Sequence, residues 1–396
     1  MQSEDLFLSS ALIPYGRQSI SDQDIQAVVD VLKSDFLTQG PAIERFENAV
    51  AGYCGALFAV STNSATSALH IACLAAGLGP GDLLWTSPNT FVASANCALY
   101  CGAEVDFVDI DDRTYNISIE RLEQKLESSK RTGKLPKVVI PVHFAGQSCD
   151  MKRISELARS YEFTVIEDAS HAIGGEYRGK KIGSCEYSDM TIFSFHPVKI
   201  ITTGEGGMIV TRKQGLHEKL IRLRSHGITR NPDLMQGPSH GPWYYQQIDL
   251  GFNFRMTDIQ AALGMSQLIR IDTFVARRHE LADRYNEAFQ GQPLTLPWQH
   301  VDTFSSYHLY VVRLMLDRLT KTHRQVFDEL RAEGILVNLH YIPVHLQPYY
   351  QDRGFRIGNF PQAEKYYDEA ITLPMYAGLT DDNQKIVIDS VKKVLQ

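Results

Sequence analysis

Short apolar runs alternate with helical patterns through the first 270 residues of the chain. The runs typical of strands lie at residues 57–60, 83–86, 105–110, 138–142, 164–167, 191–195 and 207–211. Helical patterns separate them at residues 64–76, 89–99, 119–128 and 150–160. This alternation is typical of a parallel sheet with helices on both faces. It predicts an α/β domain built on one seven-stranded sheet.

The pattern changes after residue 228. Residues 229–247 hold three turn dipeptides followed by Trp243, Tyr244 and Tyr245, which favours a lid or an interface arm. A long helical pattern then runs from Asp258 to about Phe289. Strand patterns at residues 307–316 and 335–339 flank a helix at 324–332, and a last helix is expected at 382–395. We expect two domains, residues 1–265 and a smaller α+β domain at 266–396.

Composition and charge limit the kinds of molecule that the protein is expected to bind. The 396 residues carry 39 basic and 46 acidic side chains, a net charge of −7, without long charged blocks, so neither nucleic acid nor an anionic membrane is expected as a partner. Six cysteines without a C-x-x-C pair indicate reduced thiols. The start of the chain lacks a basic leader region and no apolar run is long enough to span a membrane, so we expect a cytoplasmic protein. The histidines show no zinc-ligand spacing, and no metal site is expected.

The segment S-T-N-S-A-T-S-A-L at residues 61–69 joins a strand to a helix. Free N–H groups at a helix N-terminus, assisted by hydroxyl groups, can bind a phosphate. Simple helix capping by Thr62 or Ser64 explains the same residues. The segment lacks the spacing of the glycine-rich fingerprints, so a dinucleotide or a nucleoside triphosphate fits poorly.

Asp168 and Lys199 are the candidates for residues that take part directly in chemistry. Asp168 follows the strand expected at residues 164–167, at the edge of the sheet where α/β folds bind ligands, although a helix N-cap is an alternative. Lys199 lies between Val198 and Ile200, where loss of hydration lowers a lysine pKa and yields an amine able to condense with an aldehyde. An ordinary surface lysine is the alternative reading of that position.

One ligand satisfies these segments together. Pyridoxal phosphate offers an aldehyde for Lys199, a phosphate for the region of Thr66 and Ser194, and a basic ring nitrogen for Asp168. Its flat ring needs a stacking partner, and Phe91 at a strand-to-helix turn is a suitable aromatic residue. The absence of a G-x-S-x-G elbow argues against a hydrolase. An NAD-dependent sugar-nucleotide enzyme and a non-catalytic cofactor-binding regulator stay as alternatives.

Long stretches of the chain resemble the DegT-like family of sugar-nucleotide aminotransferases. They are residues 34–41, 63–70, 167–172, 194–203, 241–245, 251–264 and 340–349. The resemblance runs essentially from end to end. It implies the aspartate-aminotransferase-like fold of pyridoxal-phosphate enzymes, with a mixed, mostly parallel seven-stranded sheet in the large domain and a smaller α+β C-terminal domain.

The resemblance also implies roles for individual residues. Lys199 would form the covalent imine with pyridoxal 5′-phosphate, and Asp168 would pair with its ring nitrogen. The other implied cofactor contacts are Ala65, Thr66, Phe91, His171 and Ser194, with Asn253 reaching in from the second subunit of a homodimer. The residues that match sugar-nucleotide contacts are Tyr15, Asp35, Phe36, Leu37, Thr38, Asn338, Leu339, His340 and Tyr341.

The implied reaction moves the amino group of L-glutamate to C4 of a UDP-linked 4-keto-6-deoxy-N-acetylhexosamine in pseudaminic acid synthesis. Another 4-keto or 3-keto nucleotide sugar is the alternative acceptor. Lys199 argues against the dehydratase branch of the family, in which a histidine takes that position. Ala65 departs from the glycine found there in many members, but it still offers its N–H group to a phosphate.

Overall fold

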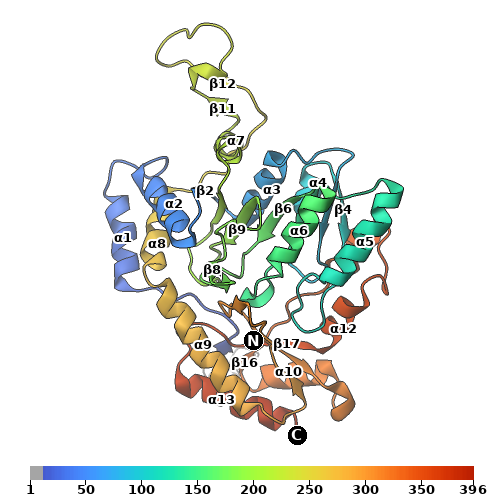
Figure 1. Ribbon diagram of the computed structural model, residues 1–396. Coiled ribbons are helices and arrows are strands. Elements are labelled where there is room, and N and C mark those ends of the chain that lie inside the picture. Colours follow the sequence, from blue (N-terminus) through green and yellow to red (C-terminus); the bar gives the residue numbers. More distant parts are fainter. Residues whose placement is uncertain (1–11) are drawn as a thin grey trace, which may run out of the picture.

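A seven-stranded sheet forms the centre of the computed structural model, which describes residues 12–396 (Figure 1). The strand order is β2-β10-β9-β6-β5-β3-β4, and β10 runs antiparallel to its neighbours while the pairs among β9, β6, β5, β3 and β4 are parallel. The bounds are β2 Phe58–Thr62, β3 Leu83–Thr86, β4 Glu104–Phe107, β5 Val138–Ile140, β6 Thr164–Asp168, β9 Met190–Ser194 and β10 Gly207–Thr211. The predicted mixed, mostly parallel sheet is confirmed. The predicted lack of a basic leader region concerns residues that lie mainly outside the described part of the chain.

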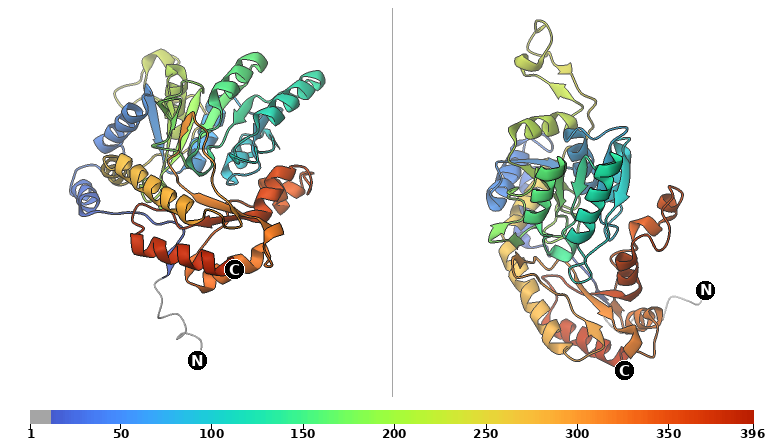
Figure 2. Two further views of the ribbon diagram at one scale, coloured as in Figure 1. Left: turned by 60° about the horizontal axis from the view of Figure 1, so that its bottom comes forward. Right: turned by 45° about the vertical axis from the view of Figure 1, so that its right-hand side comes forward.

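Both faces of this sheet are covered by helices (Figures 1 and 2). In β10, Ile209 packs into one apolar cluster while Met208 and Val210 pack into another, because successive side chains of a strand point to opposite faces. Helices on one face are α3 Ala65–Ala75, α4 Ala93–Tyr100 and α7 Gln214–Arg224. Helices on the other face are α2 Pro41–Cys54, α5 Ile119–Thr132, α6 Met151–Tyr161 and α8 Asp258–Leu268, with α1 Asp22–Leu32 packed outside α8.

The C-terminal part of the chain builds a second layer below the central sheet (Figure 1). Its antiparallel sheet contains β13 Leu294–Thr295, β15 Tyr310–Leu314 and β17 Ala370–Leu373. The helices are α9 Ile271–Ala288, α10 His323–Ala332, α11 Pro348–Gln351, α12 Pro361–Glu369 and α13 Asp381–Val394. Strand β1 Ile13–Pro14 pairs with β16 Ile335–Leu336, so Ile13 belongs to the core of this layer. The division between residues 265 and 266 stays a prediction.

The single helix expected from Asp258 to Phe289 is two helices. Helix α8 ends at Leu268 and α9 begins at Ile271, with Arg270 at a non-helical φ of −102° and ψ of 3° between them. The Arg270 guanidinium is bonded to the Asp24 carboxylate and donates to the Ser19 carbonyl over 3.3 Å. These partners are far away in the sequence, so helical periodicity could not reveal the break. The strand expected at 105–110 is also shorter, because β4 ends at Phe107.

A hairpin projects from the body of the molecule (Figures 1 and 2). It is formed by β11 Ile228–Thr229 and β12 Gln246–Gln247, and it carries Trp243, which is 71% exposed. A smaller sheet of β7 Glu176–Tyr177, β8 Lys180–Lys181 and β14 Thr303–Phe304 links the two layers. Across residues 12–396, every helix is too short or too polar to cross a membrane.

Candidate active site

A cavity of about 640 Å³ lies at the carboxyl edge of the central sheet. Its walls come from the turns that follow β2, β3, β6 and β9, joined by residues of the C-terminal layer. Ligands bind at this edge of α/β sheets because strand ends and helix N-termini present polar groups there. Of the residues predicted for the site, those that line this cavity are Tyr15, Ala65, Thr66, Phe91, Asp168, His171, Ser194, Lys199, His340 and Tyr341.

Lys199 is placed by a compact turn that follows β9. Its N–H donates to the His196 carbonyl over 2.9 Å, and the next two residues, Ile200 and Ile201, are buried in the core. Burial lowers the pKa of the Lys199 amine to about 8, because loss of water disfavours the ammonium form, and the nearby Asp168 charge partly opposes this. The Lys199 amine therefore loses its proton more readily than an ordinary lysine does.

Asp168 is the last residue of β6 and is only 5% exposed. Its Oδ2 accepts the hydroxyl hydrogen of Ser94 over 2.6 Å, and its Oδ1 accepts the N–H of Ser170 over 3.1 Å. Backbone bonds to Pro141 and His143 fix the strand end on the other side. A buried carboxylate held in this way can bind a protonated ring nitrogen that enters the cavity.

Helix α3 points its N-terminus at the cavity. Ser64 caps the helix by accepting the N–H of Ser67 over 3.1 Å, which leaves the first N–H groups, those of Ala65 and Thr66, without a partner inside the helix. A Cβ atom on Gly207 would lie 2.6 Å from the Ala65 nitrogen, so only glycine lets β10 approach so closely. With Ser194 at the end of the adjacent β9, the arrangement suits a phosphate group.

The remaining walls are aromatic. Phe91 is 58% exposed on the wall of the cavity, where its ring can stack on a flat ligand. The Nδ1 of His171 accepts the N–H of Ala145 over 3.3 Å, so the proton of its neutral ring lies on Nε2, which donates to the Tyr341 hydroxyl over 3.0 Å. Burial and then the charge of Lys199 hold the pKa of His171 well below its usual range.

Two further residues belong to the cavity although sequence reasoning missed them. His308 precedes β15, and its ring centroid lies 4.5 Å from that of His171. Burial, reinforced by the charge of Lys199, holds the pKa of His308 well below its usual range. Ser94 lies in α4 and bonds to Asp168. A serine among the small and apolar residues at the start of α4 is the sequence signal that could have indicated Ser94.

Several predicted residues do not line this cavity in the single chain. Asp35, Phe36, Leu37 and Thr38 form an exposed turn after α1, and Asn253 is exposed after the hairpin. Asn338 and Leu339 precede His340, and Asn338 is bonded through its backbone to Thr372 of β17. Their predicted roles therefore stay predictions.

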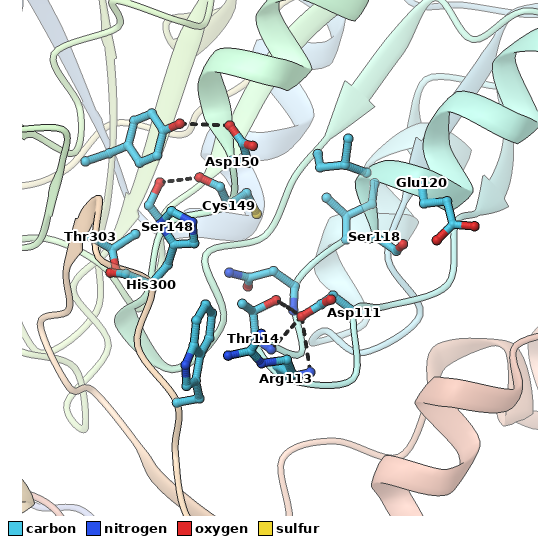
Figure 3. A pocket seen from close by; sticks show the side chains of 15 residues that line it. Asp111, Arg113, Thr114, Ser118, Glu120, Ser148, Cys149, Asp150, His300 and Thr303 are labelled. Carbon is cyan, nitrogen blue, oxygen red and sulfur yellow. Dashed lines mark hydrogen bonds between the residues drawn. The ribbon is translucent and has the colours of Figure 1, made fainter.

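A second cavity of about 270 Å³ lies between the starts of α5 and α6 and the segment around Trp298 (Figure 3). Its charged groups are held by their own surroundings. The Asp111 Oδ1 accepts the Thr114 hydroxyl over 2.9 Å, and the Arg113 guanidinium lies 3.9 Å from the centre of the Trp298 ring. The described residues that line it include no lysine, so it lacks an amine for imine chemistry.

The first cavity matches the demands of pyridoxal 5′-phosphate. A lysine with a lowered pKa, a buried carboxylate and a helix N-terminus that suits a phosphate face one space, and they sit on a mostly parallel seven-stranded sheet. This combination defines a pyridoxal-phosphate enzyme of the aspartate aminotransferase fold. The chain belongs to the DegT/DnrJ/EryC1/StrS aminotransferase family, whose profile matches residues 18–392.

Named relatives cover nearly the whole chain. The spore coat polysaccharide biosynthesis protein SpsC of Bacillus subtilis is 40% identical over 97% of this chain and 97% of its own length. The UDP-4-amino-4,6-dideoxy-N-acetyl-beta-L-altrosamine transaminase of Campylobacter jejuni is 36% identical over 97% of this chain and 98% of its own.

Solved structures agree with the fold. Helicobacter pylori PseC, an aminotransferase involved in the biosynthesis of pseudoaminic acid, has a TM-score of 0.88 and 32% identity over 97% of this chain and 99% of its own. A Streptococcus pneumoniae sugar aminotransferase in its PLP form has a TM-score of 0.86 and 29% identity over 97% of this chain and 100% of its own. The predicted family, fold and cofactor are confirmed, and the chain is a sugar aminotransferase.

Proposed function

We propose that the protein transfers the amino group of L-glutamate to C4 of UDP-2-acetamido-2,6-dideoxy-β-L-arabino-hex-4-ulose, a step of pseudaminic acid biosynthesis. The observation that carries the aminotransferase chemistry is the pairing of Lys199 and Asp168 on one cavity. The choice of sugar is supported by the 36% identity to the Campylobacter jejuni transaminase and by the likeness to the Helicobacter pylori structure.

Lys199 is the residue that moves protons. Pyridoxal phosphate, when bound, supplies an aldehyde carbon for the amino group and a ring that accepts electrons. A lysine whose pKa is lowered to about 8 can take the proton from Cα of glutamate and later return one to the sugar carbon. Proton transfer by a side chain held in place is typically worth about 10²- to 10⁴-fold in rate.

The other residues hold the cofactor in the orientation that this proton transfer needs. Asp168 keeps the ring nitrogen protonated, and Phe91 stacks on the ring. Thr66, Ser194 and the N–H of Ala65 bind the phosphate. We assign His171 to the ring substituents of the cofactor, because it lines the cavity together with Tyr341, to which its Nε2 is hydrogen-bonded.

The working unit we propose is a homodimer. Asn253 and the turn at residues 35–38 are exposed in the single chain and outside its cavity, as expected for groups that serve the site of a second copy. The projecting hairpin with Trp243 would lie against the same partner. Tyr15, His340 and Tyr341 line the chain's own cavity, and together with Asn338 and Leu339 we assign them to the sugar nucleotide.

A substrate panel tests the proposal. The protein loaded with pyridoxal phosphate is incubated with L-glutamate and UDP-linked 4-keto-6-deoxy sugars of both the L-arabino and the D-xylo series, and the amino sugar is assigned by NMR. We expect 4-amination of the L-arabino sugar. Product from the D-series sugar alone would refute the assignment.

Another keto nucleotide sugar is the second candidate acceptor. The Bacillus subtilis relative, which has a different name, is more similar to this chain than the Campylobacter jejuni transaminase is. Adding dTDP- and GDP-linked 4-keto sugars and a 3-keto sugar to the panel separates these cases. If glutamate alone left the visible absorption of the cofactor unchanged, a non-catalytic regulator would be indicated instead.

A further inference from the structure

The Asp168 carboxylate accepts a hydrogen bond from a buried serine hydroxyl, and the proposed reaction assigns no role to this serine. Ser94 is 0% exposed, and its Oγ donates to Asp168 Oδ2 over 2.6 Å. Ser94 Oγ also lies 2.9 Å from the Oγ1 of Thr90, which is itself 2% exposed. A serine hydroxyl has one hydrogen, and here Asp168 receives it, so Thr90 must be the donor in the second bond. Both hydroxyl groups are therefore oriented toward the carboxylate.

Capping of helix α4 does not account for Ser94. The N-cap residue of α4 is Val92, which makes no side-chain bond to the helix. The Ser94 side chain instead reaches a residue 74 positions away in sequence, on β6. Its backbone N–H donates to the Phe91 carbonyl over 3.2 Å, so one short turn places both the stacking ring and the hydroxyl donor.

A donor on this carboxylate influences where a shared proton lies. When a protonated ring nitrogen faces a carboxylate, the proton can stay on nitrogen or move to oxygen, depending on the relative proton affinities of the two groups. A hydrogen bond donated to the ionised carboxylate stabilises that ionised form and lowers its affinity for the proton. Bonds to ionised groups are also stronger than bonds between neutral groups, and a chain of two hydroxyl groups strengthens the bond further.

We propose that Ser94, supported by Thr90, is a positioning residue that holds the Asp168 carboxylate toward the cofactor and keeps the shared proton on the ring nitrogen. The inference rests on the proposed function, because a protonated ring is needed only where the ring accepts electrons during amino transfer. It concerns the resting protein, however, and can be measured without turnover.

Nitrogen NMR provides the direct test. The protein and its variants are loaded with pyridoxal phosphate labelled with ¹⁵N in the ring, and the ring resonance is compared with that of Asp168→Asn, which serves as the reference for a ring without a carboxylate partner. We expect a protonated ring in the unmodified protein. Ser94→Ala should move the resonance toward that of the unprotonated ring, Thr90→Val should move it less, and Ser94→Thr should restore it.

Cofactor affinity gives a second readout. The Ser94–Asp168 bond exists with and without the cofactor, so only its strengthening by the charge of the bound ring affects the affinity, and Ser94→Ala should raise the Kd for pyridoxal phosphate by about tenfold. The matched control is a cofactor analogue with a carbon in place of the ring nitrogen. Ser94→Ala should leave the affinity for this analogue within about twofold, because the shared proton is absent.

Two outcomes would overturn the proposal. One is an unchanged ring resonance in Ser94→Ala with a wild-type thermal unfolding midpoint. The other is an equal loss of affinity for cofactor and analogue, which would mean that Ser94 only supports packing. If Ser94→Ala did not fold, Thr90→Val would decide by the same criteria. A protein that aminates none of the sugars but shows the expected resonances would contradict the proposed function and leave this inference intact.

Discussion

The two cavities contain similar chemical groups but use them differently. In the second cavity, the Asp150 carboxylate accepts the Tyr177 hydroxyl over 2.8 Å and the Arg113 guanidinium stacks on Trp298. These groups interact with one another, and their interactions contribute to the stability of the fold. In the first cavity, burial lowers the pKa of Lys199 to about 8, and Lys199 and Asp168 both line the space that a ligand would occupy. The proposed chemistry is thus associated with buried polar groups that the fold places along an open space instead of against one another.

The largest expected effect comes from removing the amine of the first cavity. Lys199→Ala should lower the rate of amino transfer from L-glutamate by at least about 10³-fold, because both proton transfers lose their group. Single-turnover absorption of the cofactor measures this rate. The matched control is Arg113→Ala in the second cavity, which should keep turnover within about twofold. Equal losses in both variants would contradict the distinction between the cavities.

The carboxylate of the first cavity should matter nearly as much. Asp168→Asn keeps the shape of the side chain but removes the charge that holds the ring proton. We expect kcat to fall by about 10²- to 10³-fold, the usual cost of losing one preorganised electrostatic group. Steady-state kinetics with L-glutamate measures it. A loss below about fivefold would show that the ring nitrogen does not need this partner.

The pH dependence of cofactor capture tests the lowered pKa of Lys199. A neutral amine attacks the aldehyde, so the rate at which the cofactor-free protein captures pyridoxal phosphate should rise with pH and level off above a midpoint of about 8. The ordinary lysine value is 10.5, and a free lysine derivative measured in parallel should therefore keep gaining rate at higher pH. Stopped-flow absorption gives both curves. A midpoint near 10 for the protein would show that burial does not act on this amine.

The smallest effect is expected in the second cavity and on stability alone. Tyr177→Phe removes the hydroxyl that donates to Asp150 over 2.8 Å, so the free energy of unfolding should fall by about 1 kcal/mol. Urea denaturation measures this change, and amino transfer should stay unchanged. A marked loss of turnover would mean that the second cavity takes part in function.

Much of the cofactor site was predictable because its residues lie at strand ends. Apolar runs located β6 and β9. Asp168 stands out as a polar residue at the end of β6, and Lys199 stands out between the apolar residues Val198 and Ile200 in the turn that follows β9. The segment that leads into α3 could be recognised from the sequence because it is rich in serine and threonine. Ser94 and His308 were missed because their roles depend on partners far away in sequence, Asp168 and His171.

The sequence by itself determined the number and sequence positions of the central strands, the candidate lysine and carboxylate, and the chemistry of the cofactor. Local patterns carry this information because burial of alternating side chains and loss of hydration follow from neighbouring residues. Only the tertiary structure decided the strand order with its reversed β10, the break at Arg270 between α8 and α9, and the hydroxyl pair behind Asp168. The physical reason is that each of these depends on which distant surfaces meet, and periodicity along the chain reports burial without reporting the partner.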